Sequence, residues 1–271
     1  MARVILITGA SSGIGFEAAK QLAQAGNIVY GAARRLDRLE ELTVYGVTPV
    51  ALDVTDAAAA QTVVDDIIQK ENRLDVLINN AGYGSYGAVE EVSIDEAKRQ
   101  FDVNLFGLAQ MTKLVLPQMR KQHSGTIINT SSMAGKVWTP FGAWYHATKF
   151  AVEGFSDSMR LELQPFGIRV VLIEPGAIKT NWGMIAADHL SESSAQGPYA
   201  KAAQRTANNL RRLYSSSFIT AASKIGRVMA KAATAKRPRT HYLTGFGAKP
   251  SVFFSRIVPN QIFDAVIKRV M

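Results

Sequence analysis

Short apolar segments alternate with amphipathic segments along the first two thirds of the chain. Short runs rich in β-branched residues predict buried strands, and apolar residues at helical spacing predict helices between them. The predicted strands are residues 4–8, 28–32, 48–52, 74–78, 126–130 and 169–173. The predicted helices are residues 14–25, 36–42, 55–70, 93–122 and 143–164. This alternation is typical of an α/β fold, in which a doubly wound parallel sheet carries helices on both faces.

Capping residues indicate where the helices begin and end. Gly26 stands where the first helix needs a C-terminal cap, and Thr55 can cap the helix after the third strand. Ser93 and Glu96 have the spacing of a capping box, which opens the long helix 93–122. Pro117 should bend that helix near its end.

The regular pattern weakens after Pro175. The elements predicted beyond it are a polar loop, two helices and a final strand, at residues 191–198, 198–213, 220–235 and 241–244. Residues 252–271 are apolar with interspersed basic residues. Since no linker or repeat interrupts the chain, we expect one Rossmann-type domain over residues 1–271.

The composition excludes several kinds of site. The 271 residues include no cysteine, which excludes disulfides, thiolate nucleophiles and cysteine-bound metals. The four histidines lack metal-ligand spacing, so we expect no metal site. Neither a signal peptide nor a run of about 18 apolar residues is present, so we expect a cytoplasmic protein. The net charge of +9 favours anionic small molecules, and no motif points to nucleic acid.

A glycine-rich loop follows the first predicted strand and opens the first helix. Its glycines, Gly9, Gly13 and Gly15, permit a tight turn and let a phosphate approach the backbone at a helix N-terminus. The spacing is Gly-x-x-x-Gly-x-Gly, and structural turns also produce such clusters. The strand–loop–helix context nevertheless favours phosphate binding.

The second predicted strand ends in two arginines. A fold that accepts NAD places an acid here, whereas Arg34, helped by Arg35, can pair with the 2′-phosphate of NADP. Asp53, at the end of the third strand, can accept a hydrogen bond from the adenine amine. The alternatives are a solvated turn for the arginines and a turn or helix cap for the aspartate.

Tyr145 and Lys149 lie four residues apart in a predicted helix, which places them on one face with Cβ atoms roughly 5–6 Å apart. An ammonium at this distance favours the phenolate and lowers the pKa of the tyrosine from about 10. Ser132 can hydrogen-bond a substrate carbonyl or alcohol. Such pairs also occur on solvated helix surfaces, so the spacing alone does not establish a catalytic site.

Six blocks in this order resemble the short-chain dehydrogenase/reductase (SDR) family, and they span most of residues 3–182. The blocks are residues 8–15, 79–82, 102–104, 131–135, 145–149 and 175–180. The end of the second strand and the long tail look similar to the hydroxysteroid and retinol dehydrogenase branch of that family.

The resemblance implies a sheet of about seven parallel strands and a set of residue roles. Tyr145 would be the general acid/base, Lys149 would lower the tyrosine pKa and bind the nicotinamide ribose, Ser132 would orient the reacting oxygen, and Asn104 would hold a water relay at a helix irregularity. Tyr145 and Lys149 would also bind the cofactor. The other cofactor-binding residues would be Gly9, Ser11, Ser12, Gly13, Ile14, Gly15, Arg34, Arg35, Asp53, Val54, Asn80, Ala81, Gly82, Pro175, Gly176, Ile178 and Thr180.

The substrate pocket should lie beyond the strand ends, under a lid at residues 183–215. Its expected residues, besides Ser132 and Tyr145, are large and apolar: Tyr83, Val137, Trp138, Phe141, Trp182, Met184 and Ile185. They favour a hydrophobic carbonyl or alcohol substrate. The alternative is that several of them pack in the core or at a subunit contact.

The leading hypothesis is an NADP-dependent carbonyl reductase or alcohol dehydrogenase. The family resemblance also implies a homo-oligomer, through helices at about 94–122 and 143–164. An NADP(H)-binding redox sensor without turnover is the alternative function. A basic stretch at residues 224–239 and an apolar extension at residues 245–271 are compatible with membrane-surface docking, but a solvated helix face and a tail packed on a partner subunit are favoured.

Overall fold

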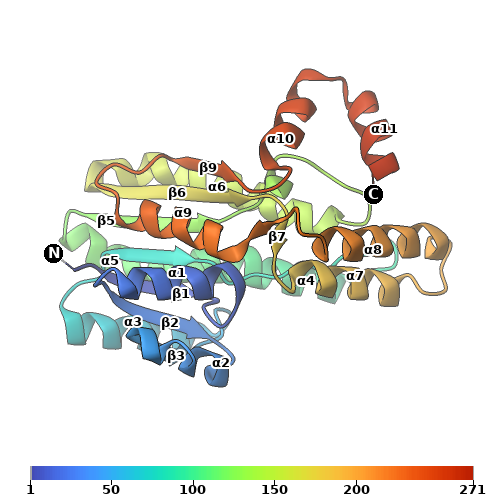
Figure 1. Cartoon of the computed structure of the whole chain (residues 1–271). Coiled ribbons are helices and arrows are strands. Elements are labelled where there is room, and N and C mark those ends of the chain that lie inside the picture. Colours follow the sequence, from blue (N-terminus) through green and yellow to red (C-terminus); the bar gives the residue numbers. More distant parts are fainter. Residues whose placement is uncertain (1, 271) are drawn as a thin grey trace.

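A seven-stranded sheet forms the centre of the protein, and the computed structural model describes residues 2–270 (Figure 1). The strand order is β3-β2-β1-β4-β5-β6-β9, and every neighbouring pair is parallel. The predicted doubly wound sheet of about seven strands is therefore confirmed. Its strands are β1 (Val4–Thr8), β2 (Ile28–Ala33), β3 (Val47–Ala51), β4 (Val76–Asn79), β5 (Gly125–Thr130), β6 (Ile168–Pro175) and β9 (His241–Thr244).

Helices cover both faces of the sheet because successive strand residues point to opposite sides. In β1, Ile5 and Ile7 pack in the core beneath α1 and α9, whereas Val4 and Leu6 pack in the core beneath α3 and α5. The covering helices are α1 (Gly13–Gln24), α2 (Leu36–Glu40), α3 (Ala57–Glu71), α5 (Leu108–Lys121), α6 (Ala143–Leu163) and α9 (Ala222–Thr234).

The predicted helices differ from the structure in two details. Helix α3 is capped by Asp56, whose Oδ1 accepts a hydrogen bond from the N–H of Ala59 at 3.0 Å. Thr55 does not cap it, because its N–H and its hydroxyl both donate to Asp53 Oδ1. The helix predicted at 93–122 runs without a break through α4 (Ile94–Phe101) and α5, but its middle, Asp102–Gly107, is π-helical. Ser93 begins α4 by accepting a hydrogen bond from the N–H of Glu96, as predicted.

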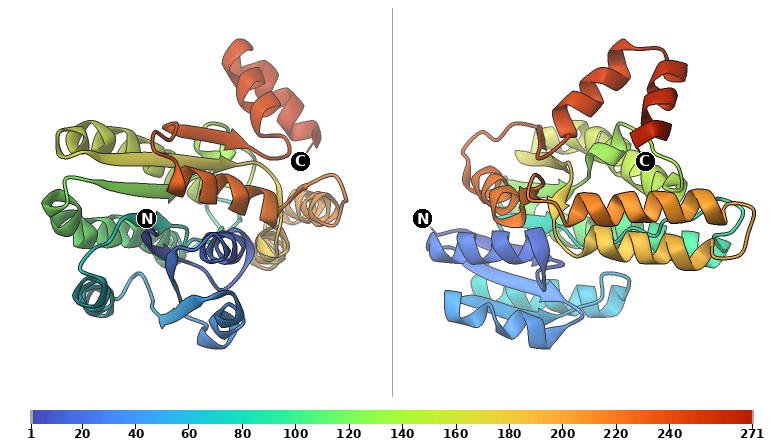
Figure 2. Two further views of the ribbon diagram at one scale, coloured as in Figure 1. Left: turned by 60° about the vertical axis from the view of Figure 1, so that its left-hand side comes forward. Right: turned by 45° about the vertical axis from the view of Figure 1, so that its right-hand side comes forward.

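Two helical hairpins extend from one end of the sheet (Figures 1 and 2). The first comprises α7 (Trp182–Ser193) and α8 (Ala200–Tyr214). The loop predicted at residues 191–198 is therefore residues 194–199 in the structure. A small sheet of β7 (Ile178–Lys179) and β8 (Thr220–Ala221) lies at its base. The second hairpin, α10 (Ala248–Ile257) and α11 (Asn260–Val270), stands away from the sheet. Within residues 2–270 no helix has the length and apolar character needed to cross a membrane.

Candidate active site

Helix α6 turns Tyr145 and Lys149 toward the interior, and each retains only 7% of its accessible surface. The Lys149 ammonium lies 5.8 Å from the centre of the Tyr145 ring. It donates a hydrogen bond of 2.9 Å to the carbonyl oxygen of Thr130, the last residue of β5. The pair therefore belongs to a buried site and not to a solvated helix surface.

Ser132 enters the same site from the end of β5. It begins the short 3₁₀ turn Met133–Gly135, and its Oγ accepts a hydrogen bond of 3.1 Å from the N–H of Ala134. The hydroxyl also lies 3.3 Å from the carbonyl oxygen of Pro175 and within hydrogen-bond reach of the Tyr145 phenol. The structure thus brings together the serine, tyrosine and lysine that the sequence singled out.

Burial dominates the ionisation of this pair. Desolvation raises the pKa of Tyr145, the neighbouring Tyr86 raises it further, and the hydrogen bond with Ser132 opposes the rise. Desolvation lowers the pKa of Lys149 to about 8, while the carboxylate of Glu153 acts in the opposite direction. The predicted lowering of the tyrosine pKa by Lys149 is therefore wrong for this structure: the pKa of Tyr145 is raised, and the group that opposes the rise is Ser132.

Asn104 lies in the π-helical segment, which is the helix irregularity expected at this position. Its side chain bonds both backbone groups of Tyr83, at 2.8 and 3.0 Å, and donates to Thr148 Oγ1 on α6 at 3.1 Å. A Cβ at Gly82 would lie 2.9 Å from Asn104 Oδ1 and 3.9 Å from Lys149 Nζ. Asn104 therefore lies on the Lys149 side of the site, held by bonds to two elements.

The glycine loop packs directly against the segment that follows β4. Gly9 has a φ of +67°, and a Cβ there would lie 2.8 Å from the Cα of Ala81. The Asn80 side-chain amide donates to the carbonyl oxygens of Thr8 and Gly9, at 3.2 Å each. A Cβ at Gly15 would collide with that same amide. These glycines are thus needed for packing as well as for any close approach of a phosphate.

The start of helix α1 fits an anionic group. Gly13 has a φ of +61°, and a Cβ there would lie 3.2 Å from Thr180 Cγ2. Among the described residues, Ser12 at the N-cap makes no side-chain capping bond, and the first turn holds no acidic residue. The positive end of the helix dipole is therefore uncompensated by the protein, which is the arrangement that binds phosphate groups.

The two arginines after β2 lie at the edge of this loop. Arg35 Nη2 donates to Ser11 Oγ and Ser12 Oγ, at 3.1 and 3.2 Å. Arg34 has a side chain that is 77% exposed, and its guanidinium lies 3.9 Å from the Asp53 carboxylate. The structure thus places the Arg35 guanidinium beside the N-terminus of α1 and the Arg34 guanidinium near Asp53.

The remaining residues expected near a cofactor are mostly involved in packing. Val54 is buried and lies against Gly107, where a Cβ would approach Val54 Cγ2 to 2.8 Å. At Gly176 a Cβ would lie 3.0 Å from the backbone nitrogen of Ala248. Thr180 Oγ1 accepts a hydrogen bond of 3.3 Å from the N–H of Trp182, and so starts helix α7.

Aromatic side chains cover Tyr145. The rings of Trp182 and Tyr86 lie 4.9 and 6.0 Å from it, and Tyr214 packs behind Trp182 at 5.9 Å. Phe141 packs against the same group. Tyr86 and Tyr214 were not among the residues expected from the sequence, because Tyr86 lies in an irregular segment and no sequence pattern places the end of helix α8, Tyr214, beside Tyr145.

Three residues expected in the substrate pocket have other surroundings. Val137 packs in a separate cluster with Val252 and Phe263 of the second helical hairpin, and not with the aromatic cover of Tyr145. Its neighbour Trp138 donates its indole N–H to Asp264 Oδ1 at 2.8 Å. Met184, on helix α7, is 36% exposed.

Comparison with known proteins identifies the family. A protein-family model described as short chain dehydrogenase matches residues 3–190 of the sequence. The chain belongs to the short-chain dehydrogenase family. It is therefore an oxidoreductase of a family that uses nicotinamide cofactors.

Individual relatives within this short-chain dehydrogenase family differ in named activity. The chain is 35% identical, over 98% of its length and 97% of that protein, to a probable short-chain type dehydrogenase/reductase VdlC of Helicobacter pylori. It is 43% identical, over 66% of its length and 65% of that protein, to a 3-ketodihydrosphingosine reductase of Bacteroides thetaiotaomicron.

Solved structures of the family share this fold. A short-chain dehydrogenase from Streptomyces avermitilis is 31% identical with a TM-score of 0.81, over 94% of this chain and 93% of that one. A metagenomic short-chain oxidoreductase in complex with NADP is 27% identical with a TM-score of 0.70, over 89% of this chain and 96% of that one.

Proposed function

We propose that this protein transfers a hydride between NADP(H) and a carbonyl or alcohol carbon of a hydrophobic substrate. The observation that carries the proposal is the buried arrangement of Ser132, Tyr145 and Lys149 at the end of β5, beside a helix N-terminus suited to phosphate. When bound, NADPH supplies the hydride. The protein supplies the proton, the orientation and the exclusion of water.

In the reductive direction, Tyr145 donates its proton to the substrate oxygen as the carbonyl carbon is reduced. Ser132 donates a hydrogen bond to the same oxygen and stabilises the negative charge that develops there. Lys149 stabilises the tyrosinate that remains and also binds the nicotinamide ribose. Asn104 holds the water through which the tyrosinate regains its proton from solvent. Oxidation of an alcohol reverses these steps.

The cofactor would lie along the glycine loop, with the 2′-phosphate on Arg34 and the adenine near Asp53 and Val54. Gly9, Gly13 and Gly15 would pass under the pyrophosphate, and the residues after β4 and β6 would border the ribose and nicotinamide: Asn80, Ala81, Gly82, Pro175, Gly176, Ile178 and Thr180. Arg34, and the lack of an acid at the end of β2, support NADP over NAD. The NADP complex of a structural neighbour agrees with this preference.

A hydrophobic substrate is supported by the aromatic cover of Tyr145, formed by Tyr86, Phe141, Trp182 and Tyr214. These side chains offer large apolar surfaces with few polar groups. A named relative acts on 3-ketodihydrosphingosine, which carries a ketone on a long alkyl chain, and such a substrate suits this lining.

The test is a panel of ketones, aldehydes and alcohols, including long-chain keto-lipids, assayed by NADPH absorbance. Tyr145→Phe removes the proton donor and is expected to lower kcat by a factor of about 10² to 10⁴, while NADPH binding persists. Full turnover by Tyr145→Phe would contradict the assignment. Tight NADPH binding without turnover on any substrate would favour the redox-sensor alternative.

A further inference from the structure

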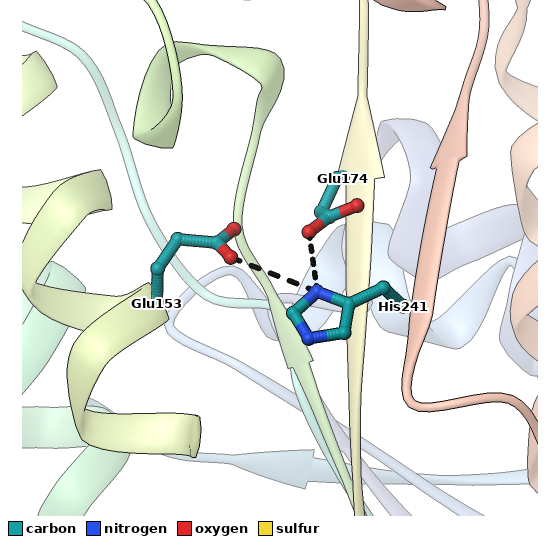
Figure 3. Close-up of side chains that lie close together, drawn as sticks. All are labelled: Glu153, Glu174 and His241. Atoms are coloured by element: carbon teal, nitrogen blue, oxygen red, sulfur yellow. Dashed lines mark hydrogen bonds and ion pairs between the residues drawn. The ribbon is translucent and has the colours of Figure 1, made fainter. Parts of the chain in front are cut away.

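A cluster of charged residues lies behind the catalytic helix (Figure 3). Lys136 Nζ lies 2.8 Å from Glu153 Oε2 on α6 and 3.0 Å from Glu174 Oε1 on β6. His241 of β9 places Nδ1 2.7 Å from Glu174 and Nε2 3.2 Å from Asp157 of α6. Glu174 and Glu153 are only 1% and 7% exposed. Helix α6 and strands β6 and β9, which are distant in sequence, are thus joined through charged side chains.

Lys136 provides the positive charge that pairs with the two buried carboxylates of the cluster. Glu153, Glu174 and His241 each offer a ligand atom within 4.8 Å of the others, but the Lys136 ammonium already bridges the two carboxylates. Burial raises the pKa of Glu153, its bond with Lys136 opposes the rise, and the neighbouring Glu174 carboxylate adds to it. Because a buried carboxylate is costly without a partner, Lys136 is the group that allows Glu153 to be ionised.

Glu153 lies on the same buried face of α6 as the catalytic lysine. It follows Lys149 by one helical turn, as Lys149 follows Tyr145. Both residues lie against Gly135, where a Cβ would lie 2.9 Å from Glu153 Cγ and 2.9 Å from the backbone carbonyl oxygen of Lys149. Within residues 2–270, the Glu153 carboxylate is the charge that opposes the loss of the proton from buried Lys149.

We infer that Glu153 is a positioning residue that keeps Lys149 protonated, and that Lys136 in turn keeps Glu153 ionised. This inference rests on the function proposed for Tyr145 and Lys149. The charged groups that face Glu153 are Lys136 from the turn before α6, Glu174 from β6, His241 from β9 and Lys149 from its own helix.

Glu153→Gln removes one negative charge and keeps the shape of the side chain. Loss of a negative charge favours loss of the proton from both Lys149 and Tyr145, which titrate as a coupled pair. The basic limb of the kcat/KM profile for carbonyl reduction is therefore expected to move to lower pH by about one unit, the lower end of the effect of an opposite charge at this range.

Glu174→Gln is the matched control. It makes the same isosteric change in the same cluster and breaks a comparable bond to Lys136, but it lies on β6 and not on the catalytic helix. A purely structural role for the cluster predicts the same behaviour from both variants. We expect both to lower the melting temperature and only Glu153→Gln to move the basic limb.

A second readout needs no turnover. Protein labelled with ¹³Cε-lysine gives an NMR titration of Lys149, assigned by the signal that Lys149→Arg lacks. The Lys149 midpoint is expected to fall in Glu153→Gln and to stay unchanged in Glu174→Gln. Absence of enzymatic activity would count against the proposed function and would leave this titration intact.

An unchanged Lys149 midpoint in folded Glu153→Gln, or an equal shift in both variants, would overturn the inference. If Glu153→Gln does not fold, Glu153→Asp performs the test. It keeps the charge on a shorter stem, so its midpoint should fall by less than one unit, about half the effect of full removal. A midpoint equal to that of the wild type would again overturn the inference.

Discussion

Arg34→Ala is expected to weaken NADPH binding by a factor of about 10 to 150 and to leave NADH binding unchanged. The side chain is 77% exposed, and its ion pair with Asp53 is long at 3.9 Å. Such a surface pair contributes about 0–1 kcal/mol, so the fold should not be affected. A hydrogen bond to a charged phosphate contributes about 1.5–3 kcal/mol, which corresponds to the stated factor.

Two neighbouring arginines are the controls. Arg35 Nη2 bonds Ser11 and Ser12 of the glycine loop, so Arg35→Ala should weaken NADPH and NADH together by loosening that loop. Arg38 pairs with Glu41 at 2.6 Å, and Arg38→Ala should change neither constant. This variant controls for the general loss of positive charge from a chain of net charge +9.

The assay is the dissociation constant of each cofactor, measured by calorimetry at one fixed ionic strength because charge effects are screened by salt. The reasoning fails if Arg34→Ala weakens NADH as much as NADPH, or weakens neither. Tighter binding of NADH than of NADPH by the wild type would refute the NADP preference itself.

Two further predictions concern stability. Phe263→Ala removes a ring that is 1% exposed and packs edge-on against Trp138 at 5.1 Å, so it should cost about 3–5 kcal/mol within the second hairpin. Hydrogen exchange in α10 and α11 should rise sharply while the sheet stays protected, whereas Val270→Ala, 65% exposed, should change little. For Lys149, the folded pKa of about 8 lies below the usual lysine value of 10.5, so the unfolded chain binds more protons and stability rises with pH between these two values. Denaturation of Lys149→Met from pH 7 to 10 should show that its stability advantage over the wild type shrinks by about 3 kcal/mol, and a constant difference would contradict the shifted pKa.

The strands could be predicted closely because each is a short apolar run bounded by glycine, proline or polar residues. The strand predicted at 28–32, for example, is Ile28–Ala33 in the structure. The irregularity at Asp102–Gly107 was expected at Asn104 from the family resemblance, but the amphipathic pattern alone does not mark which residues form a π-helical turn. Asp56 caps α3 in place of the predicted Thr55 because Thr55 is bonded to Asp53 in the preceding turn.

The residues of the site could be found from sequence where they share one helix or one loop. Tyr145 and Lys149 are four residues apart, and the glycine loop is continuous. The cover of Tyr145, however, brings together Tyr86, Trp182 and Tyr214 from separate segments of the chain, and no local pattern reports such contacts. Val137 was expected in the wall of the substrate pocket for the same reason, since no local pattern shows that it packs against the second hairpin.

The inner face of α6 carries Tyr145, Lys149 and Glu153 at four-residue spacing, so a phenol, an ammonium and a carboxylate lie in a row along the buried side of the helix. Burial by itself works against this row, because it raises the pKa of the phenol and lowers that of the ammonium. A site that needs a charged lysine must therefore receive compensation from the side away from the substrate. Glu153 provides it, and the Lys136 ammonium behind it keeps that carboxylate charged. The fold thus places a second layer of charge behind the catalytic helix, and β9, which follows the lid in sequence, completes it through His241.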